Sequence, residues 1–244
     1  MKAREETQKT KSSERSGGLL GKLHKNPKKA FIFDFDDTLI NTKDISIKRH
    51  KEAVRRLGIE FDEKELIKRW GQPWPQMLSE FLGDGAKEFV EIMKGLEDMG
   101  FRQIEGTNNF LSYLKSRNFY LGILTSSQRE WTFKKAESAS IDIRNFEDWL
   151  IFCNEDVKEC KPSASAFEPI INGLNARGVS KEGIYYCGDL ILDLETARNA
   201  GVNFIAVTTG FHKKEDFIKA GLGGGMIINS IKELPSKIEE LKIY

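Results

Sequence analysis

Apolar residues along this chain fall into short continuous runs that alternate with stripes at helical spacing. Six runs have the length and composition of buried strands: Ala30–Asp34, Phe119–Leu124, Trp149–Phe152, Ile184–Cys187, Phe204–Val207 and Met226–Ile228. Between most of them, apolar residues recur every three or four positions, as in Ala166, Ile170 and Leu174. Strands that alternate with helices predict an α/β fold with a Rossmann-like parallel sheet and right-handed crossovers.

One interval breaks this alternation. About eighty-five residues separate the first two strands, far more than one crossover helix needs. Three helical stripes lie within it, centred on Ala53, Leu78 and Met93. We therefore expect residues 43–104 to form a helical cap inserted into a catalytic core made of residues 29–42 and 105–244. An insertion that follows the first strand would lie over the strand ends and could cover a site there.

The first 28 residues have a different composition from the rest. Residues 1–30 hold nine Lys or Arg and three Glu, a net charge of +6 within a chain whose total is +1. Few of these residues are apolar, so we interpret residues 1–28 as a basic, disordered extension. A nucleic-acid-binding arm or a targeting peptide are alternatives. The three Glu and the lack of a continuous apolar run argue against a targeting or secretion signal.

Composition bounds the class of protein. The chain has 244 residues, of which 39% are hydrophobic and 31% charged, as in a globular protein. No apolar stretch approaches the length of a membrane span, so we expect no membrane partner. Cys153, Cys160 and Cys187 are odd in number and lack metal-ligand spacing. We interpret them as reduced thiols in a cytoplasmic protein.

Polar residues that suit phosphate chemistry follow several of the predicted strands. Asp34 and Asp36 end the first run, Thr125 follows the second, and Asp189 follows the strand that ends at Cys187. Because parallel strands bind ligands at their carboxyl ends, these side chains should converge with Lys161, which lies just before Pro162. Buried carboxylates without partners would cost several kcal/mol each, which favours a hard cation at this edge.

These segments together resemble the haloacid dehalogenase superfamily of phosphatases, and most closely its phosphoglycolate phosphatase-like branch with a helical cap. The family pattern is Asp-x-Asp-x-Thr, a strand ending in Ser or Thr, Lys-Pro, and Gly-Asp-x-x-x-Asp. All four occur in this order, at Asp34–Thr38, Thr125, Lys161–Pro162 and Gly188–Asp193. The resemblance covers residues 29 to about 240.

The resemblance implies a role for each matched residue. Asp34 would be the nucleophile that forms an aspartyl-phosphate. Asp36 would be the acid and base, with a pKa raised by burial and neighbouring carboxylates. Thr125 would donate a hydrogen bond to the phosphoryl oxygens. Lys161 would neutralise those oxygens and hold the nucleophile.

The resemblance also implies a Mg²⁺ site. Its ligands would be Asp34, the backbone carbonyl of Asp36, and Asp189. Asp193 would act through water or outer hydrogen bonds, or would only cap the following helix.

Other polar residues near the motifs have simpler interpretations. Asp37 and Thr38 suit a tight turn, and Ser126 and Ser127 suit the cap of the next helix. Within residues 43–104, we expect three arginines to lie on solvated helical faces: Arg49, Arg55 and Arg56. The aromatic stretch Arg69–Pro75 is either a packed turn between cap helices or a segment that touches the substrate.

We therefore expect a Mg²⁺-dependent phosphatase acting on a small phosphorylated metabolite, such as a phosphoglycolate-like compound, a sugar phosphate or a nucleotide monophosphate. A sugar phosphomutase of the same superfamily and a non-catalytic binding protein on this fold are the alternatives. We expect no nucleic-acid partner, and a monomer or homodimer.

Overall fold

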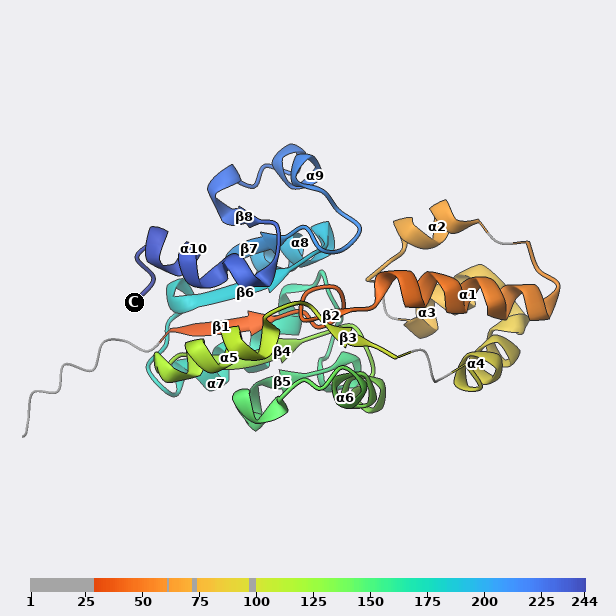
Figure 1. Ribbon diagram of the computed structural model, residues 1–244, viewed down its shortest axis with the longest axis horizontal. Coiled ribbons are helices and arrows are strands. Elements are labelled where there is room, and N and C mark those ends of the chain that lie inside the picture. The colour runs from red at the N-terminus through yellow and green to blue at the C-terminus, as the bar shows by residue number, and fades with distance from the viewer. Residues whose placement is uncertain (1–28, 61, 72–73, 97–99) are drawn as a thin grey trace, which may run out of the picture.

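The computed structural model describes residues 29–60, 62–71, 74–96 and 100–244 (Figure 1). Its centre is a six-stranded, wholly parallel sheet of order β5-β4-β1-β6-β7-β8. The strands are β1 (Ala30–Phe33), β4 (Tyr120–Leu124), β5 (Ile151–Phe152), β6 (Ile184–Gly188), β7 (Asn203–Val207) and β8 (Ile227–Ile228). Each contains or overlaps one of the six predicted runs, so the predicted α/β, Rossmann-like fold is confirmed.

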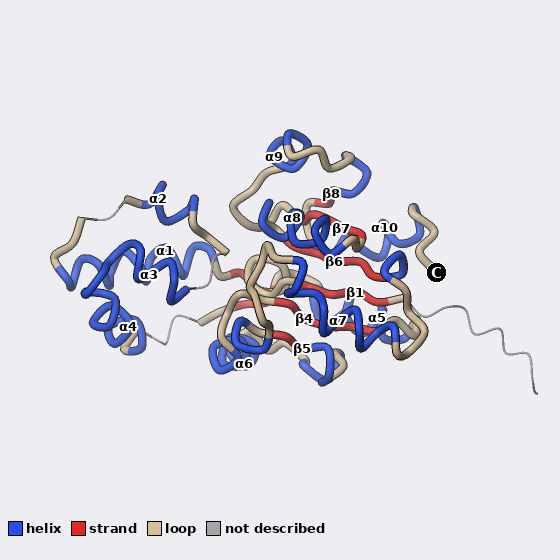
Figure 2. Tube along the Cα trace, turned by 180° about the vertical axis from the view of Figure 1, so that it is seen from behind, coloured by secondary structure: helices blue, strands red, loops and turns tan. Residues whose placement is uncertain are grey.

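Side chains of the central strand alternate between two apolar layers because successive residues of a strand point to opposite faces. Phe31 and Phe33 join the layer that also holds helices α5 (Thr107–Ser116) and α10 (Leu234–Glu240). Ala30 and Ile32 join the layer on the other face. There α7 (Glu168–Asn175), α8 (Ile191–Ala200) and α9 (Lys214–Lys219) supply the apolar partners. Figure 2 shows α7 and α8 in front of the sheet when it is viewed from behind.

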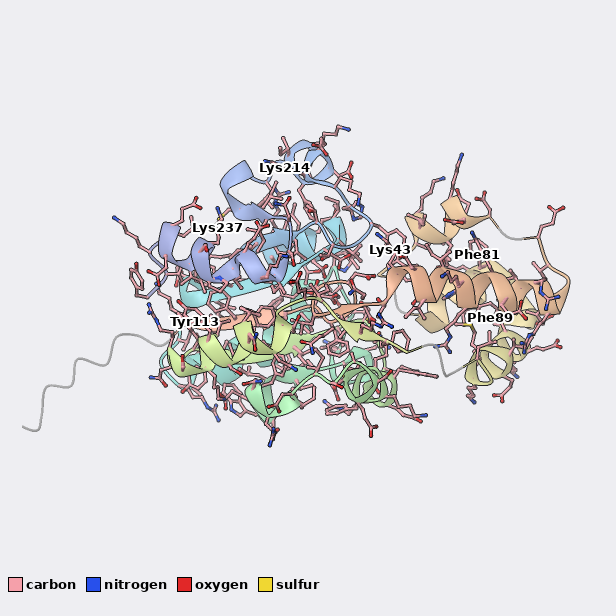
Figure 3. The ribbon with its side chains drawn as sticks, viewed as in Figure 1. Lys43, Phe81, Phe89, Tyr113, Lys214 and Lys237 are labelled. Atoms are coloured by element: carbon pink, nitrogen blue, oxygen red, sulfur yellow. The ribbon has the colours of Figure 1, made fainter. Side chains whose placement is uncertain are left out.

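Four of the described α-helices lie beyond the end of the sheet as a separate group (Figure 1). They are α1 (Lys43–Leu57), α2 (Glu63–Lys68), α3 (Trp74–Leu82) and α4 (Ala86–Lys94). They share their own apolar cluster, in which Ala53, Met77 and Phe89 are buried. Figure 3 shows Phe89 on the inner side of this group, whereas Lys214 on α9 lies on the exposed surface. The sequence pattern predicted three of these helices and missed α2, whose single buried residue is Leu66.

Two short strands connect this helical insertion to the sheet. They are β2 (Ile40–Asn41) and β3 (Arg102–Gln103), which pair antiparallel. Each has only two residues and no apolar run, so the sequence pattern did not predict them. Their pairing holds the two connections of the insertion side by side.

The structure bears on two features noted in the composition, the absence of long apolar stretches and the three cysteines. Among the described residues, no helix is long and apolar enough to cross a membrane. Cys153, Cys160 and Cys187 are free thiols, two of them buried.

Candidate active site

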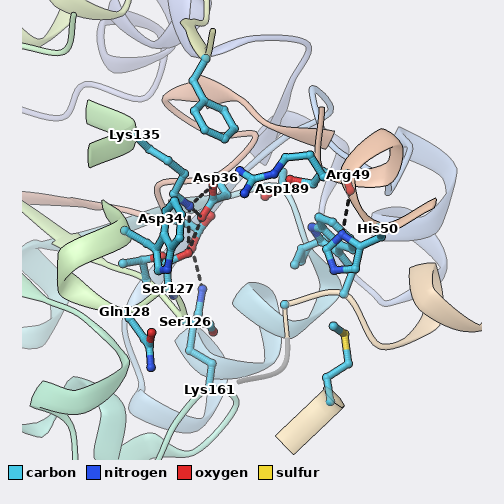
Figure 4. Close-up of a pocket in the computed structure, with 18 of the residues that line it drawn as sticks. Asp34, Asp36, Arg49, His50, Ser126, Ser127, Gln128, Lys135, Lys161 and Asp189 are labelled. Atoms are coloured by element: carbon cyan, nitrogen blue, oxygen red, sulfur yellow. Dashed lines mark hydrogen bonds and ion pairs between the residues drawn. The ribbon is translucent and has the colours of Figure 1, made fainter. Parts of the chain in front are cut away.

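Three strand ends and one loop bring the matched motif residues to a single pocket. Asp34 follows β1, Thr125 follows β4 and Asp189 follows β6, and these three strands are adjacent and parallel. Lys161 reaches the same place from the loop before α7. All four side chains are buried, and they line a pocket of about 180 Å³ (Figure 4). The convergence expected from the parallel arrangement is therefore present.

Lys161 joins two of the carboxylates. Its Nζ donates hydrogen bonds of 2.7 Å to Oδ1 of Asp34 and of 2.7 Å to Oδ1 of Asp193. The hydroxyl of Tyr186 donates to the same Oδ1 of Asp193 at 2.7 Å. Burial raises the pKa of Asp34 to about 7 against the lowering effect of Lys161, and Asp193 adds to the rise. The two carboxylates more than offset the effect of burial on Lys161, whose pKa lies above its ordinary value, so this lysine stays charged.

Asp189 is a buried carboxylate of the same pocket. It is 1% exposed, and Thr38 donates to its Oδ1 at 3.4 Å. Burial raises its pKa well above the ordinary value, and repulsion from Asp37 and Asp34 adds to the effect. Gly210, in the loop after β7, lies against it so closely that a Cβ there would be 1.7 Å from Oδ2 of Asp189.

The carboxylates fit a divalent cation. Asp34, Asp189 and Asp193 each offer an oxygen, and these three atoms lie within 4.8 Å of one another. Asp193 already accepts hydrogen bonds at both oxygens, Oδ1 from Lys161 and Oδ2 from the backbone N–H of Leu190 at 3.1 Å. Burial raises the pKa values of Asp34 and Asp189, and repulsion from neighbouring carboxylates adds to the rise; a cation would relieve that repulsion.

Asp193 makes the contacts expected of both interpretations of this residue, a helix cap and an outer support of the site. It sits in the first turn of α8, where it accepts from the backbone of Leu190 in the manner of a capping residue. It also orients Lys161, which contacts the candidate nucleophile Asp34.

Asp36 has a partner that sequence reasoning missed. The ammonium group of Lys135, on α6 (Arg129–Ser138), contacts both carboxylate oxygens of Asp36. The hydroxyl of Ser127 donates to Oδ2 of Asp36 at 2.7 Å and accepts from Lys135 at 3.0 Å. Burial alone would raise the pKa of Asp36, but Lys135 and Ser127 outweigh it, so the pKa lies below its ordinary value. The expected raised pKa is wrong for this arrangement.

The sequence pattern holds little signal for Lys135. It occupies the buried side of α6 together with Thr132 and Ala136, at spacings of three and one residues. These positions form no clear apolar stripe in the sequence, so the pattern does not mark Lys135 as buried. The partner itself could not be read, since Asp36 is 99 residues away in the chain.

Some polar residues in or beside the motifs make local contacts, and others make contacts with distant segments. Asp37 has φ 56° and accepts from the backbone N–H groups of Thr42 at 2.9 Å and Lys43 at 2.8 Å, which agrees with a turn. Thr38 and Ser127 contact Asp189 and Asp36 respectively, so the interpretation of Ser127 as only a helix cap is wrong. The N-cap of α6 is Gln128.

The helical insertion supplies much of the other wall of the pocket. Arg49 is 5% exposed, so its predicted place on a solvated face is wrong. Arg55 and Arg56 are exposed and pair with Glu52 on the same helix, as predicted.

Only part of the aromatic stretch Arg69–Pro75 lies within the described residues. Trp70 packs 4.9 Å from Phe211 of the core and 5.7 Å from His50, between ring centroids. Residues 72–73 and the side chains of Trp74 and Pro75 lie outside the described parts. The contacts of Trp70 agree with a packed turn, and Trp70 also lines the pocket.

Comparison with known proteins identifies the family. The model for haloacid dehalogenase-like hydrolases matches residues 31–207. A candidate pyrophosphatase of Clostridium perfringens, PpaX, is 26% identical over 184 residues, which cover 73% of this chain and 83% of that protein. A phosphoglycolate phosphatase of Synechococcus elongatus is 25% identical over 213 residues, covering 78% and 89%. A solved structure described as a candidate β-phosphoglucomutase of Thermotoga maritima has a TM-score of 0.67, with 19% identity and coverage of 87% and 99%.

The chain belongs to the haloacid dehalogenase-like hydrolase family. The membership inferred from the four motifs is confirmed by the family match. The predicted class of enzyme, a phosphomonoester hydrolase of this family, agrees with the phosphatase names among its relatives. The likeness to the β-phosphoglucomutase structure concerns the fold alone.

Proposed function

We propose that this enzyme hydrolyses a small phosphate monoester through a phosphorylated Asp34. The observation that supports this most directly is the contact between Lys161 and Asp34 at the end of β1. It directs a nucleophilic oxygen and a positive charge into one buried pocket. The phosphatase names of the relatives point to the same class of reaction.

In the first step, an oxygen of Asp34 attacks the phosphorus, and the bond from phosphorus to the ester oxygen breaks. The electron pair goes to the leaving oxygen, which takes a proton from Asp36. In the second step, Asp36 accepts a proton from a water molecule that attacks the phosphorus and releases Asp34. The contact with Lys135 favours the ionised Asp36, the form that the second step needs. The first step needs a protonated Asp36. The contact between Lys135 and Asp36 must therefore weaken before that step, because it favours the ionised carboxylate.

The remaining groups bind and neutralise the phosphoryl oxygens. Lys161 supplies a permanent positive charge, and Thr125 can donate its hydroxyl hydrogen. The hydroxyl of Ser126 also lines the pocket; it is buried and has no hydrogen-bond partner among the described residues, so it suits a polar ligand.

Asp34 and Asp189, with the backbone carbonyl of Asp36, would hold Mg²⁺, and Asp193 would support the site through Lys161. The bound cation would neutralise charge on the phosphoryl group as the anionic nucleophile approaches. We further propose that residues 43–104 act as a cap that moves on its two connections, near Asn41–Asp44 and Gly100–Glu105.

The test is a phosphate-release screen over about fifty phosphorylated metabolites, with and without Mg²⁺, on the wild-type enzyme and Asp34→Asn. The panel includes phosphoglycolate, sugar phosphates and nucleoside monophosphates. We expect Mg²⁺-dependent phosphate release that Asp34→Asn abolishes. Transfer of phosphate to a second sugar position without release would instead identify a phosphomutase. Retention of more than a few percent of activity in Asp34→Asn would exclude Asp34 as nucleophile.

A further inference from the structure

A buried arginine of the helical insertion extends into the pocket. Arg49 lies on α1, lines the pocket and is 5% exposed. Figure 4 shows its side chain extending from α1 toward the part of the pocket where Asp36 and Asp189 are labelled. None of the four family motifs contains it, and the mechanism above gives it no role.

Contacts from the insertion and from the core hold the guanidinium group of Arg49. Its Nη2 donates to the backbone carbonyl of Met93, on α4, at 2.6 Å. Its Cζ lies 5.5 Å from the centre of the Trp131 ring, which belongs to α6 of the core. A guanidinium is planar and carries five N–H donors in a fixed fork. Contacts from a carbonyl and a ring orient that fork before a ligand arrives, so less conformational freedom is lost on binding.

The rest of the pocket wall away from the carboxylates is largely apolar. Large apolar side chains that line it come from both the insertion and the core: Trp70, Met77, Met93, Phe101, Trp131 and Leu190. Contact with such a wall would contribute little to the binding of a leaving group as small and polar as glycolate, which has almost no apolar surface to bury. A leaving group with a larger apolar surface would bind more tightly, because each Å² of apolar surface removed from water contributes roughly 25 cal/mol.

We propose that Arg49 binds an acid group on the leaving group of the substrate. The substrate class is then a phosphate monoester whose apolar, ring-containing body carries a second anionic group. The phosphate being transferred lies against Asp34 and Lys161, the body against Trp131 and the methionines, and the second acid group on the fork of Arg49. A carboxylate and a second phosphate share the chemistry that a guanidinium recognises. This inference rests on the proposed phosphatase function.

The experiment compares substrates that differ in one feature. Phenyl phosphate supplies the ring without an acid group, and 4-carboxyphenyl phosphate adds a carboxylate. Phenylene 1,4-bisphosphate adds a phosphate instead, and phosphoglycolate keeps the carboxylate without the ring. We expect wild-type kcat/KM for an acid-bearing aryl phosphate to exceed that for phenyl phosphate by about tenfold to a hundredfold, the range for a charge-assisted hydrogen-bonded pair. The acid group, carboxylate or phosphate, that gives the larger ratio of kcat/KM to that of phenyl phosphate is the one that the pocket prefers.

Arg49→Met and Arg49→Lys test the residue, and Arg55→Met is the matched control. Arg55 lies on the same helix, is exposed and pairs with Glu52. We expect Arg49→Met to reduce the ratio between acid-bearing and plain aryl phosphate to less than about threefold, with a partial loss in Arg49→Lys. Arg55→Met should keep the wild-type ratio. A ratio measured within one variant does not depend on how much of that variant is folded.

The possible failures are distinguishable. If wild-type enzyme hydrolyses phenyl phosphate as well as or better than both acid-bearing esters, the inference is overturned while the phosphatase function stands. The same holds if Arg49→Met keeps the wild-type ratio. A higher kcat/KM for phosphoglycolate than for 4-carboxyphenyl phosphate would overturn the inference that the leaving group has an apolar, ring-containing body. If no phosphate ester is hydrolysed with Mg²⁺, the proposed function falls, and this inference falls with it.

Discussion

Lys135 contacts both carboxylate oxygens of Asp36, although the two residues are 99 positions apart in the chain. The contact is nearly closed to solvent, with the lysine side chain 10% and the aspartate side chain 22% exposed. It places an ammonium group against the residue proposed to exchange protons with the leaving group and with water. The strength of this contact therefore bears on the pH at which the enzyme works.

Replacing Lys135 should move the pH dependence of activity upward. Lys135 lowers the pKa of Asp36 against the opposing effect of burial, so Lys135→Met should raise that pKa. Any part of the pH profile of kcat/KM that reflects the titration of Asp36 should therefore shift to higher pH. The measurement is a pH profile of the variant, with Lys214→Met as an exposed-lysine control. A profile that stays in place, or moves to lower pH, would contradict this role of Lys135.

Lys161→Met should lower kcat more than it changes KM. The lysine neutralises the phosphoryl oxygens and holds Asp34, so its loss should reduce kcat by about 10²–10³. It should also destabilise the fold by about 3 kcal/mol, because two buried carboxylates lose their shared partner. Steady-state kinetics and thermal unfolding measure the two effects. A change in KM alone would make Lys161 a residue for substrate binding only.

Gly210→Ala should weaken metal binding. A Cβ at this position would lie 1.7 Å from an oxygen of Asp189, so the carboxylate would have to move. We expect the dissociation constant for Mg²⁺ to rise about tenfold or more, as when groups that orient a metal ligand are changed. Calorimetric titration of Mg²⁺ or Mn²⁺ into the protein measures this without reference to activity.

The control for that variant is Gly224→Ala, since a Cβ at Gly224 would meet nothing within 4 Å. Its metal affinity should match that of the wild-type protein. Equal affinity in a well-folded Gly210→Ala would show that Asp189 is no metal ligand, or that its position does not depend on Gly210.

The insertion should lose stability in mild acid because of His50. Burial lowers the pKa of His50 to about 4 against the opposing effect of the Ser46 carbonyl, and the neighbouring charge of Arg49 adds to the lowering. The unfolded chain, with an ordinary pKa near 6.5, binds the proton first as pH falls. Stability is therefore full above about pH 6.5 and falls between there and about pH 4, by about 3 kcal/mol in all.

Urea unfolding at several pH values measures this loss. His50→Gln removes the titrating group, so its stability should change less over the same pH range. An equal slope in both proteins would assign the acid sensitivity to other residues, such as the paired carboxylates of the core.

How much of this protein could be predicted from its sequence depends on how local each signal is. The six strands were predictable because each buries both faces and therefore appears as a continuous apolar run. The helix α2 and the pair β2–β3 were missed because they are short and contribute little to the core.

The candidate site divides in the same way. The sequence by itself determined that Asp34, Thr125 and Asp189 would meet, because each follows a parallel strand and parallel strands end at one edge. Only the tertiary structure decided that Lys135 binds Asp36, that Gly210 abuts Asp189, and that Arg49 turns into the pocket. These contacts join helices and loops far apart in the chain, and side-chain packing between elements leaves no periodic trace in either segment.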